Sequence, residues 1–411
     1  MANSAQNQNV IQTRCCIVGG GPAGMMLGFL LARAGVEVVV LEKHGDFLRD
    51  FRGDTIHPST LELLHELGLL DDFLKLPHQE LHSVQITADG KTVPVADFSQ
   101  LPTHSKFIAF MPQWDFLSFL ADNAQQYPQF HLRMETKATD LIEENGWITG
   151  VRATTPTGEL TIKAQLVIGT DGRHSTIRDK ASLAVQDFGV PIDVLWMRIP
   201  KDPSVGEQSL GYVRPGKFMV LIDRHEYFQC GFLIPKGQLD AVKQRGLAAL
   251  QADILGLAPF VGEYVHELDS WEKISLLAVK IDRLRQWYRP GLLCIGDAAH
   301  AMSPAGGVGI NMAIQDAVAT ANLLAEPLRK EIVSIKDLAC VQRRRQWPVR
   351  VIQAGQIFAH RRLINVAATR PTAFPPFILW LFRHVPVFRR LPAYLIGIGP
   401  RPEHIQTKSF W

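Results

Sequence analysis

Apolar positions along this chain follow two periods, one typical of strands and one typical of helices. The apolar run RCCIVGG (14–20) leads into a segment of helical spacing (22–34) that Gly35 ends, and the run VEVVVLEK (36–43) follows. A glycine directly after the last helical position is a common way for a helix to stop. The pattern therefore predicts a strand, a helix and a second strand within residues 14–43.

Two further helices are predicted before residue 130. In HPSTLELLHELG (57–68), Ser59 and Glu62 have the spacing of a capping box, and Gly68 has the position of a helix stop. The stretch WDFLSFLADNAQQY (114–127) also has helical spacing.

Short β segments with turn residues occur in two separate parts of the chain. SVQITADGKTVPVADF (83–98) contains the Asp89-Gly90 dipeptide of a hairpin, and a similar texture extends from about residue 185 to 281. These two parts predict one mostly antiparallel sheet. The apolar runs in AQLVIGTDG (164–172) and GLLCIGDAAH (291–300) indicate buried strands that return to the first sheet.

The predicted fold class is α/β, with a Rossmann-like nucleotide-binding domain, an inserted, mostly antiparallel β-sheet domain and C-terminal helices. The expected divisions are 1–80, 106–184 and 285–365 for the first domain, 81–105 and 185–284 for the inserted domain, and 366–411 for a helical tail.

Three glycines lie at the junction of the first predicted strand and helix. Gly19, Gly21 and Gly24 have G-x-G-x-x-G spacing, and Glu42 follows Gly24 by 18 residues. A helix N-terminus offers free N–H groups and partial positive charge, which suit a phosphate. Gly19 permits a tight turn, Gly21 removes the Cβ that would block a pyrophosphate, and Gly24 permits close packing. With Glu42 as an acceptor for ribose hydroxyls, the unit predicts dinucleotide binding; the alternative is a structural turn.

Two later stretches extend this motif. LVIGTDGRHSTIR (166–178) ends a strand with Asp171 and Gly172, and LLCIGDAAHAMSPAGGVGINMAIQDA (292–317) places Asp297 before a second loop and helix start. The three motifs, in this order and over essentially the whole chain, resemble the single-component FAD-dependent aromatic monooxygenases, the para-hydroxybenzoate hydroxylase-like enzymes. The glycine motif alone does not distinguish NAD from FAD, whereas the resemblance implies FAD.

The resemblance also implies roles for single residues. Asp297 would bind the ribityl hydroxyls of FAD, and Asp171 with Gly172 would contact FAD and NAD(P)H. Arg52 would lie near the flavin and the pyrophosphate. It is the candidate catalytic residue, because it could couple movement of the flavin to the arrival of NAD(P)H.

Further positions match cofactor contacts of the family. Gln113 matches a cofactor-contacting glutamine, and Ala138 matches a backbone contact to the adenine. A helix that starts near Gly309 would direct free N–H groups at the reduced flavin, which carries negative charge. Pro304, Gly306 and Gly307 would let backbone lie against the isoalloxazine; the alternative for PAGGVG is a flexible loop. The residues expected to bind the cofactor are Gly19, Gly21, Pro22, Ala23, Gly24, Glu42, Lys43, Arg52, Gln113, Ala138, Asp171, Gly172, Asp297, Pro304, Gly307, Gly309, Ile310 and Asn311.

The function implied by the resemblance is monooxygenation with NAD(P)H and O₂ as co-substrates. A flavin C4a-hydroperoxide would hydroxylate an aromatic or polyketide-like small molecule, with FAD as cofactor and NADH or NADPH as a transient reductant. No second glycine motif provides a separate nicotinamide domain. The alternative is an FAD-dependent reductase or dehydrogenase of a quinone or isoprenoid precursor. A flavin-dependent halogenase is disfavoured by LWMRIP (195–200) in place of W-x-W-x-I-P, and a binding module without catalysis is disfavoured because all three acidic residues are present.

The substrate is expected beneath the inserted sheet. Strand alternation must turn some of its polar and aromatic side chains inward, but the sequence leaves open which of them. The candidates are Trp196, Arg198, Tyr212, Phe218, Phe228 and Phe232. His57 and His300 are interpreted as hydrogen-bonded structural histidines, because no second catalytic group is paired with them in sequence.

Charge and cysteine content narrow the remaining classes. The 411 residues include 43 Lys and Arg against 40 Asp and Glu, and this formal net charge of +3 is too small to favour nucleic acid. The five cysteines form no C-x-x-C pair and no zinc spacing, so we expect no metal site and a reduced, cytoplasmic chain. The basic run QRRRQW (342–347) is interpreted as a solvated helix face.

The most apolar tract lies near the C-terminus. FPPFILWLFRHVPVFRRLPAYLIGIG (374–399) is interrupted by arginines before it reaches the length of a membrane span. We expect its helices to pack on the body of the protein, with a peripheral membrane contact as the alternative. The chain is expected to be a monomer or a homodimer.

Overall fold

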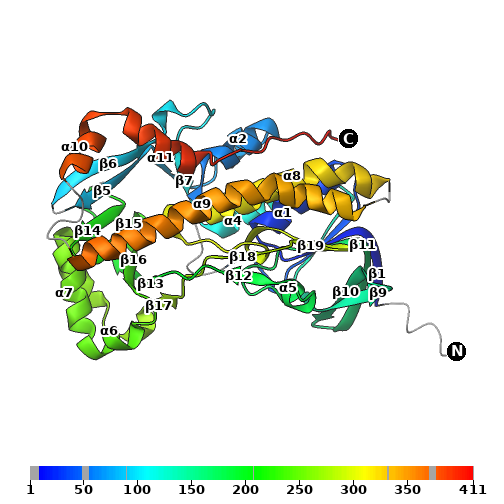
Figure 1. Cartoon of the computed structure of the whole chain (residues 1–411), viewed down its shortest axis with the longest axis horizontal. Helices are drawn as coiled ribbons and strands as arrows, with labels where there is room; N and C mark the ends of the chain where they lie inside the picture. Colours follow the sequence, from blue (N-terminus) through cyan, green and yellow to red (C-terminus); the bar gives the residue numbers. More distant parts are fainter. Residues whose placement is uncertain are drawn as a thin grey trace.

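Two large sheets follow one another along the long axis of the molecule in the computed structural model (Figure 1). The structure describes residues 9–48, 55–88, 90–206, 208–330, 333–369 and 376–410. One sheet has eight strands and belongs to the half with the glycine motif, and the other has seven. The predicted α/β class is confirmed.

The eight-stranded sheet brings the three motif-bearing strands together. β1 pairs in parallel with β2 on one side and with β11 on the other, and β20 pairs in parallel with β11. This confirms the predicted strand, helix and strand of residues 14–43 and the buried parallel strand before Asp171. The strands are β1 (Val10–Val18), β2 (Val38–Leu41), β8 (Phe130–Arg133), β9 (Lys137–Glu144), β10 (Trp147–Thr155), β11 (Gly158–Gly169), β19 (Tyr288–Arg289) and β20 (Leu292–Cys294).

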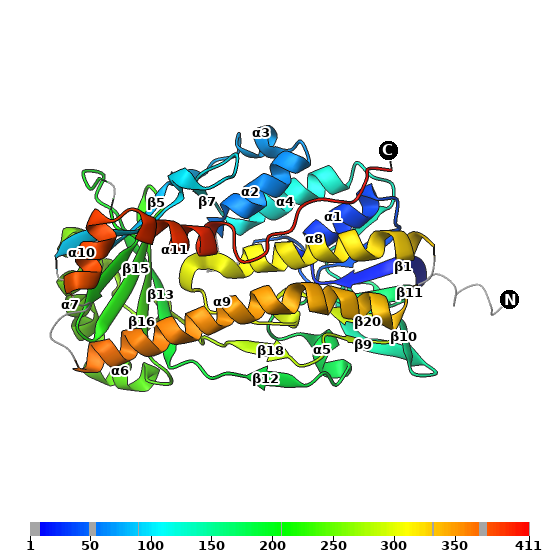
Figure 2. The ribbon, with the colours of Figure 1, turned by 45° about the horizontal axis from the view of Figure 1, so that its top comes forward.

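Helices cover this sheet, and α1 is almost completely buried among them. Pro22 is the first residue of α1, where its missing N–H costs nothing, and Gly35 ends the helix with φ +79. The helices of this half are α1 (Pro22–Arg33), α2 (Pro58–Glu66), α3 (Leu70–Phe73), α4 (Gln113–Ala124), α5 (Thr176–Lys180), α8 (Val308–Arg329) and α9 (Ile335–Thr369). α9 runs along most of the molecule and contacts α8 (Figures 1 and 2).

The seven-stranded sheet is built from two parts of the chain, as predicted. Its order is β17-β13-β16-β15-β14-β5-β6, and every pairing is antiparallel except that of β14 with β5. Ala88 pairs with Lys91 across the predicted two-residue hairpin, of which Asp89 lies outside the described residues. The strands are β5 (Ser83–Ala88), β6 (Lys91–Asp97), β13 (Ile192–Pro200), β14 (Gly211–Arg214), β15 (Lys217–Asp223), β16 (Tyr227–Pro235) and β17 (Ser275–Leu277).

Two smaller sheets and two helices were not predicted from the sequence. β3 (Thr55–Ile56), β7 (Ile108–Phe110) and β4 (Gln79–Leu81) form one sheet, and β12 (Val185–Asp187) pairs with β18 (Asp282–Leu284). The helices are α6 (Leu239–Arg245) and α7 (Leu247–Leu257). α7 packs on β14 and β15 and covers one face of the seven-stranded sheet.

The position of α7 shows which of the candidate substrate residues face the core and which face away from it. Tyr212, Phe228 and Phe232 belong to the buried cluster between the sheet and α7, so they are core residues. Trp196 packs in a different cluster, near Ile357 of α9. Arg198 and Phe218 share the face of Trp196, since strand neighbours alternate.

The predicted capping box at the start of α2 is wrong. The N-cap is His57, and Pro58 occupies the first turn, so the helix begins before Ser59. Glu62 binds the N–H of His104 instead (2.9 Å). The predicted stop is confirmed, since Gly68 has φ +72 just beyond the helix.

The chain ends with α10 (Pro376–His384), α11 (Val387–Gly397) and an extended tail. The tail returns to the end of α1, where the N–H of Phe410 donates to the carbonyl of Arg33 (2.9 Å) (Figure 2). α9 continues through the predicted division at residue 365. In the residues described, no helix is long and apolar enough to cross a membrane.

Candidate functional site

The turn between β1 and α1 has the backbone geometry of a phosphate loop. Gly19 has φ +111, and a Cβ there would lie 2.6 Å from the carbonyl oxygen of Thr170. A Cβ on Gly24 would lie 1.9 Å from the oxygen of Gly19, so the helix packs directly on the loop. A Cβ on Gly21 would meet nothing within 4 Å, and no side chain caps α1. The first N–H groups of α1 are therefore available to a ligand beside open space.

Glu42 holds this loop from the end of β2. Its Oε2 accepts a hydrogen bond from the N–H of Gly20 (3.1 Å), and its Oε1 accepts one from the N–H of His44 (3.0 Å). A Cβ on Gly20 would lie 2.9 Å from the Cβ of Glu42, so this fourth glycine, which was not among the predicted site residues, is also required. The buried Glu42 carboxylate therefore ties the end of β2 to the glycine turn.

The second motif lies against the first. A Cβ on Gly19 would be 2.8 Å from the Cα of Asp171. The Asp171 carboxylate accepts hydrogen bonds from the Ser175 hydroxyl (2.5 Å) and the N–H of Ile177 (3.1 Å), which ties β11 to α5. Burial raises the pKa of Asp171, while these hydrogen bonds act in the opposite direction. The side chain thus supports the fold, and the backbone around Gly172, with φ +82, is the part left for a cofactor.

Arg173 is a candidate ligand that the sequence analysis missed. Its Nη2 lies 3.5 Å from Oδ2 of Asp297, in the third motif. Its Nη1 is buried and has no hydrogen-bond partner among the described residues. A buried guanidinium N–H without an acceptor suits a phosphate or another anionic group.

Gly296 brings the third motif against the first. A Cβ on Gly296 would lie 3.3 Å from the Cβ of Ala23 in the first turn of α1 and 3.2 Å from the Cβ of Ala313 in α8. Asp297 is the next residue, and its side chain is 31% exposed. The open corner at Gly21 and the carboxylate of Asp297 therefore lie at one junction, close enough for one extended dinucleotide to reach both.

The N-terminus of α8 opens at the same junction. Gly307 is its N-cap with φ +63, and a Cβ there would lie 2.3 Å from the hydroxyl of Thr55. No side chain caps this helix, and a Cβ on Gly309 would meet nothing within 4 Å. Pro304 and Ile310 are half-buried beside it.

Asn311 holds the loop before α8 from inside. Its Oδ1 accepts hydrogen bonds from the N–H of His57 (3.1 Å) and the hydroxyl of Thr60 (2.6 Å). Its amide nitrogen donates to the carbonyls of Thr55 and Gly307, both at 3.4 Å. The Asn311 side chain is thus committed to the protein, which leaves its backbone for the predicted cofactor contact.

Helix α9 binds the loop before α8 from the side opposite to Asn311. The side chain of Gln356 accepts a hydrogen bond from the N–H of Ser303 and donates to the carbonyls of Ser303 and Ala305, each at 3.1 Å. Nε2 of His360 lies 3.1 Å from the Ser303 hydroxyl, and burial lowers the pKa of His360 to about 4.

His57 and His300 are hydrogen-bonded structural histidines, as predicted. Nδ1 of His57 donates to the carbonyl of Ile396 (2.7 Å), and burial lowers the pKa of His57 to about 4. Nε2 of His300 lies 2.5 Å from Oδ2 of Asp316. Both rings are buried.

Asp316 is the centre of a buried charge cluster beneath the third motif. In addition to its interaction with His300, Oδ2 of Asp316 accepts a hydrogen bond from the N–H of Gly296 (3.0 Å). Its Oδ1 accepts a hydrogen bond from the Nε–H of Arg345 (2.9 Å). Arg345 also lies 3.2 Å from Glu403. Burial opposes the charged form of Asp316, but the interactions with His300 and Arg345 outweigh it and lower its pKa.

This cluster corrects the interpretation of residues 342–347 as a solvated helix face. Arg345 is 1% exposed, Arg344 pairs with Glu403 (2.7 Å between Nε and Oε1), and Gln342 accepts the N–H of Trp287 (3.0 Å). The basic run was misleading because one side of α9 packs against α8 and the chain end, where carboxylates neutralise it.

The remaining predicted residues are spread around the junction. Gln113 is the first residue of α4 and is half-buried, and Lys43 is exposed. Ala138 is buried on β9, two residues after Thr136, whose N–H donates to the carbonyl of Glu42 (2.8 Å). Arg52 lies outside the described residues.

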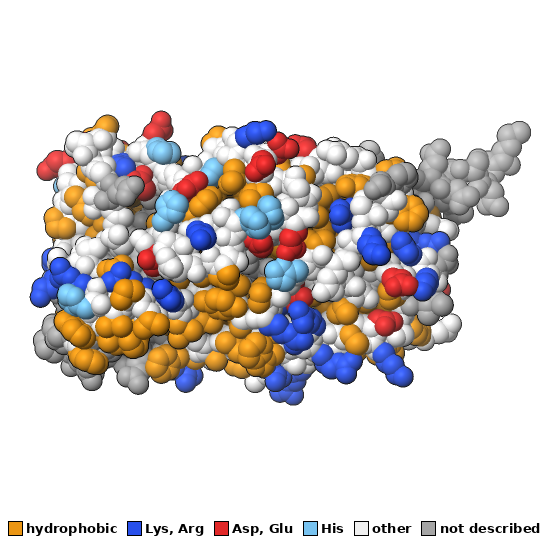
Figure 3. Space-filling model, turned by 90° about the horizontal axis from the view of Figure 1, so that it is seen from above, with side chains coloured by type: hydrophobic (Ala, Val, Ile, Leu, Met, Phe, Trp, Pro, Cys, Tyr) orange, Lys and Arg blue, Asp and Glu red, His pale blue; other side chains and the backbone are white. Residues whose placement is uncertain are grey.

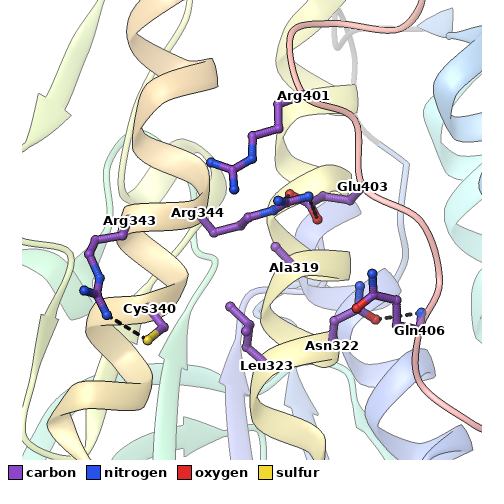
Figure 4. Close-up of a pocket in the computed structure, with 9 residues that line it drawn as sticks. All are labelled: Ala319, Asn322, Leu323, Cys340, Arg343, Arg344, Arg401, Glu403 and Gln406. Carbon is purple, nitrogen blue, oxygen red and sulfur yellow. Dashed lines mark hydrogen bonds and ion pairs between the residues drawn. The ribbon is translucent and has the colours of Figure 1, made fainter.

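Two cavities lie elsewhere in the molecule. One of about 460 Å³ lies between α8, α9 and residues 401–406, where Arg344 reaches toward Glu403 (Figure 4). A second, of about 650 Å³, lies along β8 and the turn between β10 and β11. None of the predicted cofactor residues lines either cavity. Within the described ranges, no three His, Cys, Asp or Glu side chains are arranged to hold a metal ion.

The residues at the junction fit FAD. Two helix N-termini without side-chain caps, the open space beside Gly21 and the unpaired Nη1 of Arg173 suit a diphosphate. The partly exposed carboxylate of Asp297 suits the ribityl hydroxyls, and that of Glu42 suits a ribose.

Comparison with known proteins gives four consistent similarities. The family model described as FAD binding domain matches residues 12–353. The 6-methylpretetramide 4-monooxygenase of Streptomyces rimosus is 32% identical over 369 residues, which cover 88% of each chain. Para-nitrophenol 4-monooxygenase of Pseudomonas sp. strain WBC-3 is 24% identical over 91% of this chain and 88% of that one. The solved structure of p-nitrophenol 4-monooxygenase from Pseudomonas putida DLL-E4 superposes with a TM-score of 0.76 at 20% identity, over 93% of this chain and 96% of that chain.

Proposed function

We propose a reaction for this chain from the premise that it belongs to the family of FAD-dependent aromatic hydroxylases related to para-hydroxybenzoate hydroxylase. It is an oxidoreductase, an FAD-dependent monooxygenase that hydroxylates an aromatic or polyketide-like small molecule. The observation that carries the proposal is the contact between Gly296 and Ala23, because it joins the predicted ribityl ligand to the diphosphate corner.

The chain's own groups would hold each part of the cofactor. The N–H groups of Ala23 and Gly24, next to the open space at Gly21, bind the diphosphate, and Asp297 binds the ribityl hydroxyls. Glu42 accepts hydrogen bonds from the ribose. When bound, FAD supplies the reducing equivalents and the activation of O₂ by which one oxygen atom is transferred to the substrate ring.

The N-terminus of α8 would serve the isoalloxazine. Its free N–H groups and the positive end of its dipole stabilise negative charge beside Gly309 and Ile310. The backbone at Pro304 and Gly307 would lie beside the ring, and Gln356 with Asn311 fixes that backbone from both sides. Preorganised backbone of this kind keeps water out and needs no rearrangement during the reaction.

The substrate would lie between the seven-stranded sheet and this loop. On the sheet face opposite to α7, Gln229 is buried and accepts hydrogen bonds from Arg224 (3.2 and 3.3 Å). The guanidinium of Arg224 lies 5.9 Å from the ring centre of Phe110 on β7, three residues before Gln113. This face is therefore the one directed at the cofactor residues, and it offers polar groups to a phenolic hydroxyl.

Finer statements about the reductant, Arg52, the compartment and the oligomeric state belong to the same proposal. NADH or NADPH supplies the electrons as a transient visitor, and Arg52 couples its arrival to movement of the flavin. The chain acts in the cytoplasm as a monomer or a homodimer, which size-exclusion chromatography with light scattering distinguishes.

The division into an FAD-binding domain, an inserted substrate domain and a helical tail also stays a prediction. A peripheral membrane contact of the C-terminal tail, the alternative left open by the sequence, concerns a different surface and does not bear on the reaction.

The test is a screen of phenols and aromatic polyketides with the purified protein. We expect a yellow protein with a flavin spectrum, whose NAD(P)H oxidation an accepted substrate accelerates with consumption of O₂. With ¹⁸O₂, one labelled oxygen atom should appear in the product. Equal turnover of substrate under anaerobic conditions would instead support a reductase of a quinone or isoprenoid precursor, and a protein that cannot be loaded with flavin would remove both proposals.

A further inference from the structure

Helices α10 and α11 present large apolar side chains to the outside. On α10, Phe377 (68% exposed) and Trp380 (53%) are three residues apart, and their rings stack with 6.3 Å between centroids. On α11, Val387 (58%), Leu391 (64%) and Tyr394 (40%) follow at intervals of four and three. These spacings place the side chains on one face of each helix.

The inner face of α11 combines the small residues Ala393 and Gly397 with isoleucines. Ala393 is fully buried, and a Cβ on Gly397 would lie 2.7 Å from Cδ1 of Leu101 and 3.3 Å from Cδ1 of Phe98. Ile398 completes this contact in the same buried cluster. A surface helix normally buries its large apolar side chains and exposes small or polar ones. On α11, Val387, Leu391 and Tyr394 lie outside this buried contact, so they do not attach the helix to the body.

The charge of this region has one sign. Residues 376–400 contain no Asp or Glu. Arg389 is used internally, since its Nε donates to the carbonyl of Phe382 (2.5 Å). Arg383 and Arg390 are exposed, and no carboxylate pairs with them in the part of the chain that the structure describes. Figure 3 shows hydrophobic side chains gathered over this end of the molecule, with Lys and Arg at their margin.

We propose that α10 and α11 form a docking face for an anionic lipid surface. Aromatic and leucine side chains would enter the boundary between headgroups and acyl chains, while Arg383 and Arg390 bind the anionic headgroups. A second copy of this chain is a poorer occupant, because a symmetric contact would bring two positive faces together. The helices lie on the surface of the bilayer, since neither is long enough to span it.

Co-sedimentation of the FAD-loaded full chain with vesicles tests this docking face. We expect binding to vesicles of phosphatidylcholine mixed with phosphatidylglycerol, weaker binding to phosphatidylcholine alone, and release by high salt. Replacing Trp380 and Leu391 together by Glu should abolish binding. The matched control is Trp347→Glu, because Trp347 is also exposed (55%) but lies on α9, and it should bind like the wild type.

A second pair of substitutions tests the charge. Arg383→Gln with Arg390→Gln should weaken binding to the mixed vesicles roughly thirtyfold, from about 1 kcal/mol for each arginine. All variants should keep their flavin spectrum, which shows that they are folded. A wild-type protein that stays in the supernatant with both vesicle types overturns the proposal. So does a stable wild-type dimer that Leu391→Glu separates, since the face would then be a contact between copies.

Discussion

Arg345 and Asp316 form a buried ion pair with 2.9 Å between Nε and Oδ1, and neither side chain is more than 1% exposed. The second oxygen of Asp316 accepts the N–H of Gly296, the residue before Asp297. The pair therefore fixes the backbone that carries the proposed ribityl ligand. It is a positioning device, which acts on the cofactor through the main chain.

Asp316→Ala should lower the free energy of unfolding by about 3 to 5 kcal/mol, because it leaves Arg345 buried without its carboxylate. Urea denaturation of the loaded protein measures this, and flavin release should become easier in parallel. The control is Glu326→Gln on the same helix, whose pair with Lys330 is exposed and whose loss should leave the denaturation midpoint unchanged. Equal effects of the two changes would contradict a special role for the buried pair.

Two glycines of the first motif should respond differently to alanine. Gly21→Ala has room for its Cβ in the free protein, so the thermal midpoint without FAD should stay the same while FAD affinity falls at least about tenfold. Gly24→Ala forces a Cβ against the oxygen of Gly19 and should cost stability of about 1 to 3 kcal/mol even without FAD. Calorimetry with and without FAD separates the two cases. A Gly21 variant that binds FAD normally would place the diphosphate elsewhere.

Asp297→Ala should weaken FAD binding by about 1.5 to 3 kcal/mol, the usual worth of a hydrogen bond to a charged group. Equilibrium dialysis with flavin fluorescence gives the affinity directly. Asp179→Ala is the matched control, since this carboxylate is 72% exposed and lies outside the junction. Unaltered FAD retention in the Asp297 variant would mean that the ribityl chain runs along a different path.

The buried His57 should make the protein less stable in acid. Its pKa is about 4 in the folded protein against 6.5 ordinarily, so the unfolded chain takes up the proton first as the pH falls. The contribution of His57 to the free energy of unfolding is therefore fully present above pH 6.5. About 3 kcal/mol of it is lost as the pH falls from 6.5 to about 4. His57→Asn keeps a donor for the carbonyl of Ile396 and should flatten this part of the stability profile. Parallel profiles for the two proteins would show that His57 is not the titrating group.

Neighbouring residues on β16 should separate substrate effects from stability effects. Phe228 packs in the core against Phe260, with 5.7 Å between ring centroids, so Phe228→Ala should cost about 3 to 5 kcal/mol of folding stability. Gln229 points to the opposite face, so Gln229→Leu should cost less stability, about 1 to 3 kcal/mol for its hydrogen bonds with Arg224. Its main effect should be to raise KM about tenfold for a phenolic substrate, or to divert NAD(P)H oxidation into peroxide. A Gln229 variant with unchanged kinetics would move the substrate away from this face.

Local backbone requirements made much of the nucleotide corner predictable from sequence. Gly19 and Gly24 are needed where the chain turns or packs within a few residues of itself, and such constraints leave a clear spacing. The order of strand, helix and strand could be predicted from the spacing of the apolar residues, which is also a local property of the sequence. Three motifs that are far apart in sequence could be assigned to one site because parallel strands end at the same edge of a sheet.

Features that depend on distant partners could not be predicted. Arg345 belongs to a basic run, and only the packing of α9 against α8 and Glu403 shows that it is buried. The direction of Phe228 was open until α7 was seen to cover one face of its sheet. Ser59 and Glu62 had the correct spacing for a cap, but Pro58 already starts the helix and Glu62 binds His104. In each case a neighbour far away in sequence decides the outcome.

The strand order affects how far the chain can fold while it is being synthesised. β1 is made first, yet its partner β11 and the next strand, β20, follow about 150 and 280 residues later. The last residues then close the end of α1, where the ring of Phe410 lies over Gly35. A nascent chain therefore carries an unfinished nucleotide corner until β11 and β20 have been made, and flavin should load only after both strands have joined the sheet.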